Sequence, residues 1–245
     1  MPVNHRFHET DFGNGFQTHN AILDVIPYKP EVLFVGTFNP DADADKSADF
    51  FYGRVGSYFW LTLWNIFVHK DKKQPDRRKY HSGPTPYFTN PDLDSIKNLC
   101  SKIKITFADL MKSVNVEHLS GYKDVGLAKL ARNGQASWYT DNIISYLQKT
   151  PSINTVYLTL QSTDVWANEW CSIKTADYGR KVEFTPIYTP TARALAGKPL
   201  YKTLLCHWLF NNHPLYGRLN HEWLKANGVQ IEYFRNLCQT GQITP

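Results

Sequence analysis

Short apolar runs separated by amphipathic segments dominate the pattern of this chain. Four runs rich in aliphatic, β-branched and aromatic residues are bounded by polar or turn-forming residues and predict strands at Val32–Thr37, Ile103–Leu110, Thr155–Leu160 and Val182–Tyr188. Apolar residues at helical spacing predict helices over Ser57–Val68, Ser137–Gln148, Thr163–Cys171 and Pro199–Phe210. Because strands alternate with helices, we expect an α/β protein, a three-layer α/β/α arrangement around a mostly parallel four-stranded sheet.

The end of the first strand has the most informative pattern. Its apolar residues stop at Gly36–Pro40, and an aromatic block at Phe51–Arg54 leads into the helix start Ser57–Trp60. A short apolar run closed by Gly and Asn-Pro suits a parallel strand whose carboxyl end opens into a loop, and open α/β sheets bind ligands at that edge. We therefore expect a pocket here.

Length and composition favour one large domain. The chain has 245 residues, 42% of them hydrophobic, so we expect a single domain over 1–245 with a loop insertion at about 69–91, where Pro and Gly are frequent. No apolar run approaches the roughly 18 to 20 residues of a membrane span, and the polar amino terminus lacks the apolar centre of a signal peptide. These features predict a cytoplasmic protein with no membrane partner.

Cysteine and histidine spacings give no metal signature. The four cysteines lie far apart without a CxxC pair, and the nine histidines form no HxxxH or HExxH spacing. We expect buried free thiols, no metal and no cofactor.

The net charge of +5 is concentrated in the predicted insertion, which we call the basic insert (residues 69–91). Between positions 69 and 80 it holds six Lys and Arg residues against two Asp residues. Such a segment can contact a phosphate backbone, but a solvated surface loop has the same composition, and both interpretations stay open. The candidate DNA-contacting residues are Lys72, Lys73, Arg77 and Arg78.

The segments Val32–Pro40 and Phe51–Trp60 together resemble the first motif of the uracil-DNA glycosylase superfamily, most like its hypoxanthine-DNA glycosylase and mismatch-specific uracil-DNA glycosylase branches. In that motif a strand ends in a Gly and Asn-Pro or Gly-Thr-x-Pro turn, and an aromatic residue precedes a Phe-Trp helix start. The late segment Ile187–Arg193 is similar to the second motif, usually His/Asn-Pro-Ser with a nearby Arg, from which Thr189 and Thr191 depart. The resemblance implies a DNA glycosylase that works as a monomer without a cofactor.

Hydrolysis of an N-glycosidic bond requires a base that leaves with its electrons, a water aimed at the sugar carbon, and a nucleotide held out of the stack. Asn39 is the candidate that orients the water or bonds the base; alternatively it is an Asx-Pro turn residue. Tyr52, or its neighbour Phe51, is the candidate stacking face, although either can simply fill the core. We place Phe38 with the base-binding residues.

Two further residues are candidates for contacting the base. The resemblance puts Asp109 where the edge of the extruded base is read. An ionised Asp only accepts hydrogen bonds, which favours a base that presents N–H groups, such as hypoxanthine. The alternative is an Asp that caps the next helix or turn. Gln161, at the end of the third predicted strand, is a further pocket candidate, with a surface or turn role as its alternative.

The second motif predicts a slow enzyme. A His before Pro-Ser can stabilise the departing base, whereas Thr189 offers only a neutral hydroxyl. Thr191 can hold a phosphate, and Arg193 can pair with it, unless Arg193 is an ordinary solvated arginine. Two other functions stay open: a catalytically silent nucleic-acid or nucleotide-binding module, and a hydrolase of free nucleosides.

Overall fold

The structure is a computed structural model that describes residues 2–7, 28–41, 51–53, 59–60, 63, 67, 93–116, 123–160 and 164–187. The chain forms two compact units. The first unit comprises Met1–Arg54 and Lys104–Pro186, and the second comprises Val55–Ile103 and Ile187–Pro245. The single-domain organisation stays a prediction.

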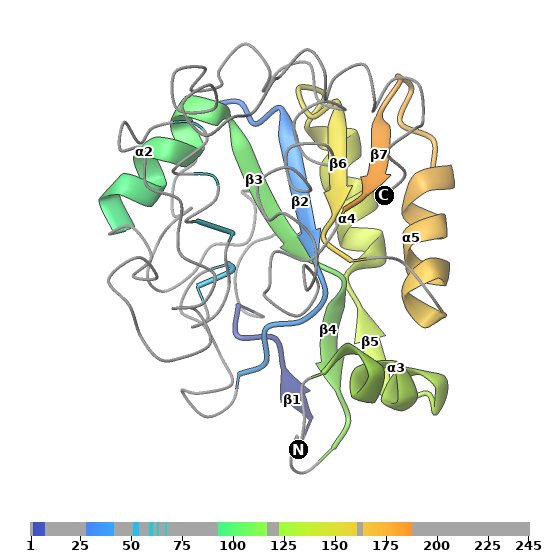
Figure 1. Ribbon diagram of the computed structural model, residues 1–245. Coiled ribbons are helices and arrows are strands. Elements are labelled where there is room, and N and C mark those ends of the chain that lie inside the picture. Colours follow the sequence, from blue (N-terminus) through green and yellow to red (C-terminus); the bar gives the residue numbers. More distant parts are fainter. Residues whose placement is uncertain are drawn as a thin grey trace, which may run out of the picture. The chain divides into compact units, whose positions relative to one another are not determined.

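A four-stranded parallel sheet forms the centre of the first unit (Figure 1). Its strands are β2 (Val32–Gly36), β3 (Ile105–Asp109), β6 (Thr155–Leu158) and β7 (Glu183–Pro186). They lie in the order β3-β2-β6-β7, and every neighbouring pair is parallel. The α/β fold with a parallel four-stranded sheet is therefore confirmed, and each of the four predicted strands is present in a shorter form.

Three of the four strands of this sheet are buried along their whole length, and most of their residues are apolar. All residues of β2, β3 and β6 are buried, as expected of parallel strands covered on both faces. Phe34 pairs in register with Phe107 on one side and Tyr157 on the other, with ring centroids 6.1 and 5.3 Å away. This row of aromatic rings makes the strand register strongly specified.

The described part of the first unit includes the helices α3 (Asp124–Arg132), α4 (Thr140–Lys149) and α5 (Val165–Thr175). Helices α4 and α5 contact each other, and Figure 1 shows α5 beside the β7 edge of the sheet. There Trp170 of α5 packs edge-on against Phe184 of β7, with ring centroids 5.6 Å apart. The predicted helix start at Ser137 is wrong, because this residue lies in a strand and α4 begins only at Thr140.

A second, antiparallel sheet in the first unit was not predicted. It consists of β1 (Val3–Asn4), β4 (Met111–Val114) and β5 (Ala136–Trp138) in the order β1-β4-β5. Only Leu110 separates β4 from the end of β3, so this small sheet begins where the large one ends. Pairing of β1 with β4 brings the amino-terminal segment to the carboxyl edge of the parallel sheet.

The second unit contains α2 (Leu93–Ile103) and part of the predicted helix Ser57–Val68. Four residues of that predicted helix are described; all are helical and buried: Phe59, Trp60, Leu63 and Phe67. The basic insert and the predicted helix Pro199–Phe210 lie outside the described residues.

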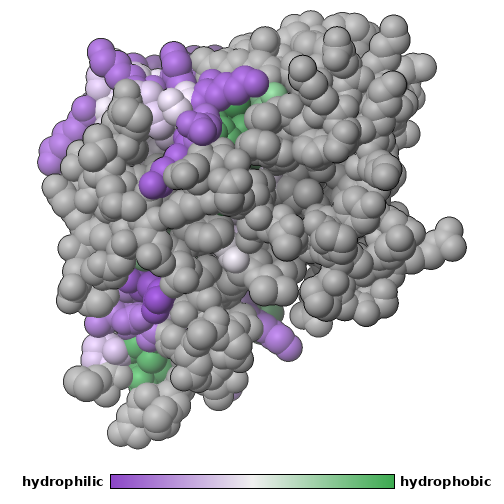
Figure 2. Space-filling view, turned by 90° about the vertical axis from the view of Figure 1, so that its left-hand side faces the viewer, coloured by the Kyte–Doolittle hydropathy of each residue, from purple (hydrophilic) through white to green (hydrophobic). Residues whose placement is uncertain are grey.

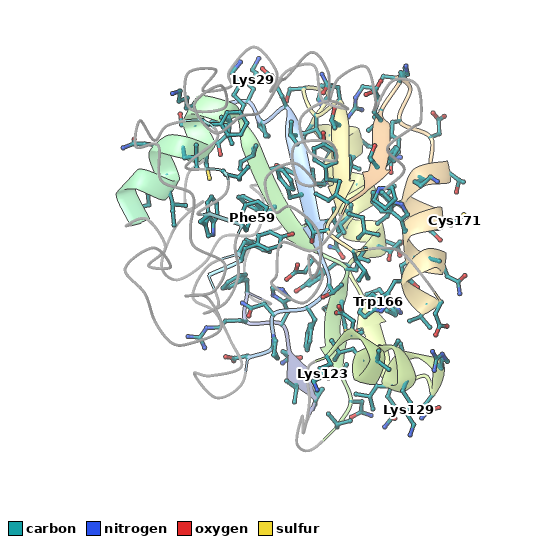
Figure 3. All side chains as sticks on the ribbon, viewed as in Figure 1. Lys29, Phe59, Lys123, Lys129, Trp166 and Cys171 are labelled. Atoms are coloured by element: carbon teal, nitrogen blue, oxygen red, sulfur yellow. The ribbon has the colours of Figure 1, made fainter. Side chains whose placement is uncertain are left out.

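Hydrophilic residues dominate the described surface on the face that Figure 2 shows, with small hydrophobic areas among them. None of the helices in the described part of the chain is long and apolar enough to cross a membrane. Cys100 is a buried free thiol, as predicted, whereas Cys171 is free but exposed on the outer side of α5 (Figure 3).

Candidate functional site

The candidate site lies at the carboxyl ends of β2, β3 and β6. Gly36 at the end of β2 is paired in register with Asp109 at the end of β3, and Thr159 immediately follows β6. The chain order reverses between β2 and β6, because β3 lies on one side of β2 and β6 with β7 on the other. Open α/β sheets bind ligands at such a reversal, outside the carboxyl ends of the strands.

Gly36 is required here because two polar atoms approach its backbone closely. A Cβ atom built on Gly36 would overlap the Oδ1 atom of Asp109 and would lie 3.3 Å from the hydroxyl oxygen of Tyr52. Any larger residue would have to displace the carboxylate. The glycine therefore brings Asp109 Oδ1 and the Tyr52 hydroxyl together over the end of β2.

Tyr52 is held in a strained conformation beside this carboxylate. Its φ of 58° lies in the left-handed region, which costs a bulky residue on the order of 1–3 kcal/mol and is most frequent at functional sites. The hydroxyl lies 2.9 Å from Thr159 Oγ1, and the Thr159 hydroxyl donates to the carbonyl oxygen of Val35 at 3.2 Å. Thr159 has only one proton to donate, so the Tyr52 hydroxyl is the donor in the first bond.

Burial raises the pKa of Tyr52 well above its ordinary value, and the negative charge of Asp109 raises it further; the bond to Thr159 acts in the opposite direction. The same two causes raise the pKa of Tyr139 to about 12. Both phenols therefore stay protonated at neutral pH and add no second negative charge beside Asp109.

Asp109 is a buried carboxylate with one oxygen bonded to His5. Asp109 is only 6% exposed, and its Oδ2 atom lies 2.8 Å from Nε2 of the fully buried His5. The backbone amide of Phe7 donates to His5 Nδ1 at 3.1 Å. Since Nδ1 accepts a hydrogen bond, Nε2 carries the imidazole proton and donates it to the carboxylate. No donor in the described part of the chain reaches Oδ1 of Asp109 within hydrogen-bond distance.

Aromatic rings surround His5. The centroids of Phe7, Phe38, Phe51 and Tyr139 lie 5.2, 6.0, 6.3 and 5.9 Å from that of the imidazole. These side chains exclude water from the bond between His5 and Asp109, which strengthens it, because a hydrogen bond to a charged group is stronger in a medium of low polarity.

The amino-terminal segment also fixes the loop that follows β2. The backbone amide of Arg6 donates to the carbonyl oxygen of Asn39 at 2.8 Å, and the Arg6 guanidinium pairs with Asp41 at 3.0 Å. His5 forms an antiparallel bridge with Pro40. Asn39 is 7% exposed and is therefore presented from a loop that is tied down on both sides.

The structure describes four of the predicted site residues, and all four lie at this carboxyl edge of the first unit: Phe38, Asn39, Tyr52 and Asp109. Phe38 contacts the His5 ring, and Phe51 is buried against Phe107 with ring centroids 5.5 Å apart. Phe51 thus fills the core, whereas Tyr52 is half-buried beside Asp109.

The remaining predicted site residues lie outside the described part of the chain: Gln161, Thr189, Thr191, Arg193, Lys72, Lys73, Arg77 and Arg78. The sequence reasoning missed His5, Thr159 and Tyr139. Thr159 could have been found, because it falls at the end of a predicted strand, next to the expected pocket. His5 carries no comparable signal, since its partner is 104 positions away.

Within the described ranges, His, Cys, Asp and Glu residues form no group of three or more that could hold a metal ion. What the site offers chemically is a carboxylate oxygen, a protonated phenol and a buried amide side chain at one sheet edge. No protein-family model matches the chain, and comparisons with curated proteins and with solved structures also find no match.

Proposed function

We propose that this chain hydrolyses the N-glycosidic bond of a deaminated base, hypoxanthine or uracil, that is extruded from DNA. One observation carries the proposal. Among the described residues no donor bonds Oδ1 of the buried Asp109 carboxylate, which lies at the carboxyl end of β3 near the hydroxyl of Tyr52, where the strand order reverses. A ligand at this edge meets an acceptor next to an aromatic ring, which is what recognition of an extruded base requires.

Asp109 supports recognition of a base through an N–H group. Its ionised carboxylate accepts hydrogen bonds and donates none, so it complements the N1–H of hypoxanthine or the N3–H of uracil. A base edge that presents only carbonyl oxygens would be repelled. The carboxylate is nearly buried, so water cannot readily replace a hydrogen bond that the base fails to make. A base without that N–H group should therefore bind more weakly.

Asn39 is the proposed water-positioning residue. Its amide side chain is nearly buried in a loop that Arg6 and His5 tie to the amino-terminal segment. An amide oxygen in so constrained a position can orient a water molecule with little further loss of entropy. Tyr52 supplies an aromatic surface beside the base, and its hydroxyl bond to Thr159 holds the ring in place.

The second motif and the basic insert complete the proposal from sequence alone. Thr189 would stand beside the departing base and make the reaction slow, because its hydroxyl is neutral. Thr191 and Arg193 would hold a phosphate. The insert's cations would bind the DNA backbone without regard to sequence.

The test is base excision by the purified protein. Single- and double-stranded oligonucleotides that carry hypoxanthine, uracil or xanthine are incubated with it, and abasic sites are then cleaved with alkali. Strand scission supports the proposal, with Asn39→Ala as the matched control for a contaminating glycosylase. Binding without scission would indicate a nucleic-acid-binding module instead, and hydrolysis of inosine without scission a hydrolase of free nucleosides.

A further inference from the structure

His5 has a role that the proposed function does not assign. It belongs to the amino-terminal segment, far in sequence from both glycosylase-like motifs, and yet its imidazole is fully buried and bonded to Asp109 at 2.8 Å. A buried polar side chain that bonds the carboxylate proposed to contact the base can influence what that carboxylate recognises.

The structure fixes which protons His5 carries. The amide of Phe7 donates to Nδ1, so a proton on Nδ1 would point at another proton and would break that bond. Four aromatic rings surround the imidazole, so no water replaces the lost partner easily. The imidazole is therefore a neutral donor through Nε2.

A neutral donor orients the carboxylate without neutralising it. Bonding of Oδ2 to His5 fixes the rotation of the Asp109 side chain and directs Oδ1 over Gly36, beside Tyr52. A lysine or arginine in place of His5 would pair with the charge and weaken Asp109 as an acceptor. With a neutral imidazole, the full negative charge stays available to a ligand at Oδ1.

We propose that His5 is a positioning residue that makes Asp109 selective for a ring N–H group, so that the site takes an oxo-purine or oxo-pyrimidine base through its protonated ring nitrogen. This inference rests on the proposed function and deepens it. It predicts that the base is rejected when that nitrogen is methylated, because the methyl group both removes the donor and meets the carboxylate.

The first experiment measures discrimination between hypoxanthine and 1-methylhypoxanthine, as free bases, by calorimetric titration of the whole protein. We expect the wild type to bind hypoxanthine more tightly, and His5→Leu to lose about tenfold or more of that preference, since a freed carboxylate is no longer directed at the base. His5→Gln, which keeps a neutral N–H donor, should restore most of it.

Phe7→Leu is the matched control. It reduces the same aromatic surroundings but keeps the backbone amide that bonds His5 Nδ1, so it should lower stability and leave the preference unchanged. If folded His5→Leu discriminates as well as the wild type, or if Phe7→Leu loses the preference equally, His5 is only a structural residue and the inference is wrong.

A second measurement uses only the wild-type protein and does not depend on enzyme activity. Nitrogen-15 NMR of the histidine rings at neutral pH should show one imidazole with its proton on Nε2 and with slow exchange of that proton. A proton on Nδ1, or on both nitrogens, would overturn the inference even if the protein excises bases. If instead the wild type neither excises nor binds any base, the proposed function fails, and with it the role of His5 in base choice.

Discussion

Replacing Gly36 with alanine should destabilise the protein far more than one added methyl group usually does. The new Cβ would occupy the position of Asp109 Oδ1 and would press on the Tyr52 hydroxyl. The carboxylate would have to move, and its bond to His5 would break, because Oδ1 and Oδ2 move together.

The magnitude follows from these two losses. Overfilling a packed site costs about 1–3 kcal/mol, and loss of a hydrogen bond to a charged group costs about 1.5–3 kcal/mol, so we expect the free energy of unfolding to fall by about 2.5–6 kcal/mol. Gly179→Ala is the matched control. Gly179 has a φ of 62° and no atom within 4 Å of a built Cβ, so only backbone strain of about 1–2 kcal/mol should appear.

Urea unfolding of the whole chain, followed by circular dichroism, measures these differences. The decisive comparison is a double-mutant cycle. Asp109→Ala removes the atom that the new Cβ would meet, so in that background Gly36→Ala should cost at least about 2 kcal/mol less. An equal cost of Gly36→Ala in both backgrounds would refute the close approach of Asp109 to Gly36.

Four further outcomes are expected. Asn39→Ala should lower turnover by roughly two to three orders of magnitude with nearly unchanged thermal stability, and equal turnover would remove Asn39 from the mechanism. Asp109→Asn should turn its amide oxygen to His5 and its NH₂ group to the base, which shifts the ratio of excision rates from hypoxanthine toward uracil by about 1–3 kcal/mol; an equal change of both rates would make Asp109 structural. Neutralising the four candidate cations of the basic insert should flatten the dependence of DNA affinity on log salt, and an unchanged slope would mean a solvated loop. Burial raises the pKa of Tyr178 from 10.0 to about 12, so between these two pH values the folded state keeps a proton that the unfolded state loses. The free energy of unfolding should therefore fall as pH rises through this range, and it should fall less steeply in Tyr178→Phe. An identical slope in that variant would contradict the raised pKa.

The parallel sheet could be predicted because three of its strands have a recognisable apolar sequence pattern. Strands β2, β3 and β6 are buried along their whole length, so apolar residues predominate in each of them. The small antiparallel sheet could not, since its strands are two to four residues long and β4 includes the polar pair Lys112 and Ser113. Trp138 was assigned to a helix because it fits the apolar spacing of α4, but it packs edge-on against Trp166 from strand β5.

The candidate site was predictable only where it is local in sequence. Asn39 and Tyr52 follow one strand, and Asp109 ends another, so a strand-end argument finds all three. His5 reaches Asp109 across 104 positions, through a two-residue strand and a bridge to Pro40, and no pattern in the sequence indicates that pairing. Such pairings between short, distant segments depend on the tertiary structure. Local residue spacing and composition do not indicate them.

The most direct test of base excision is detection of the released base itself. Hypoxanthine-containing DNA is incubated with wild-type protein or with Asn39→Ala under single-turnover conditions, and free hypoxanthine and abasic sites are counted by mass spectrometry. The proposed mechanism predicts one free base for each abasic site with the wild type, and release slower by roughly a hundredfold or more with the variant. Absence of free base with the wild type on both single- and double-stranded DNA, for hypoxanthine and for uracil alike, would contradict it.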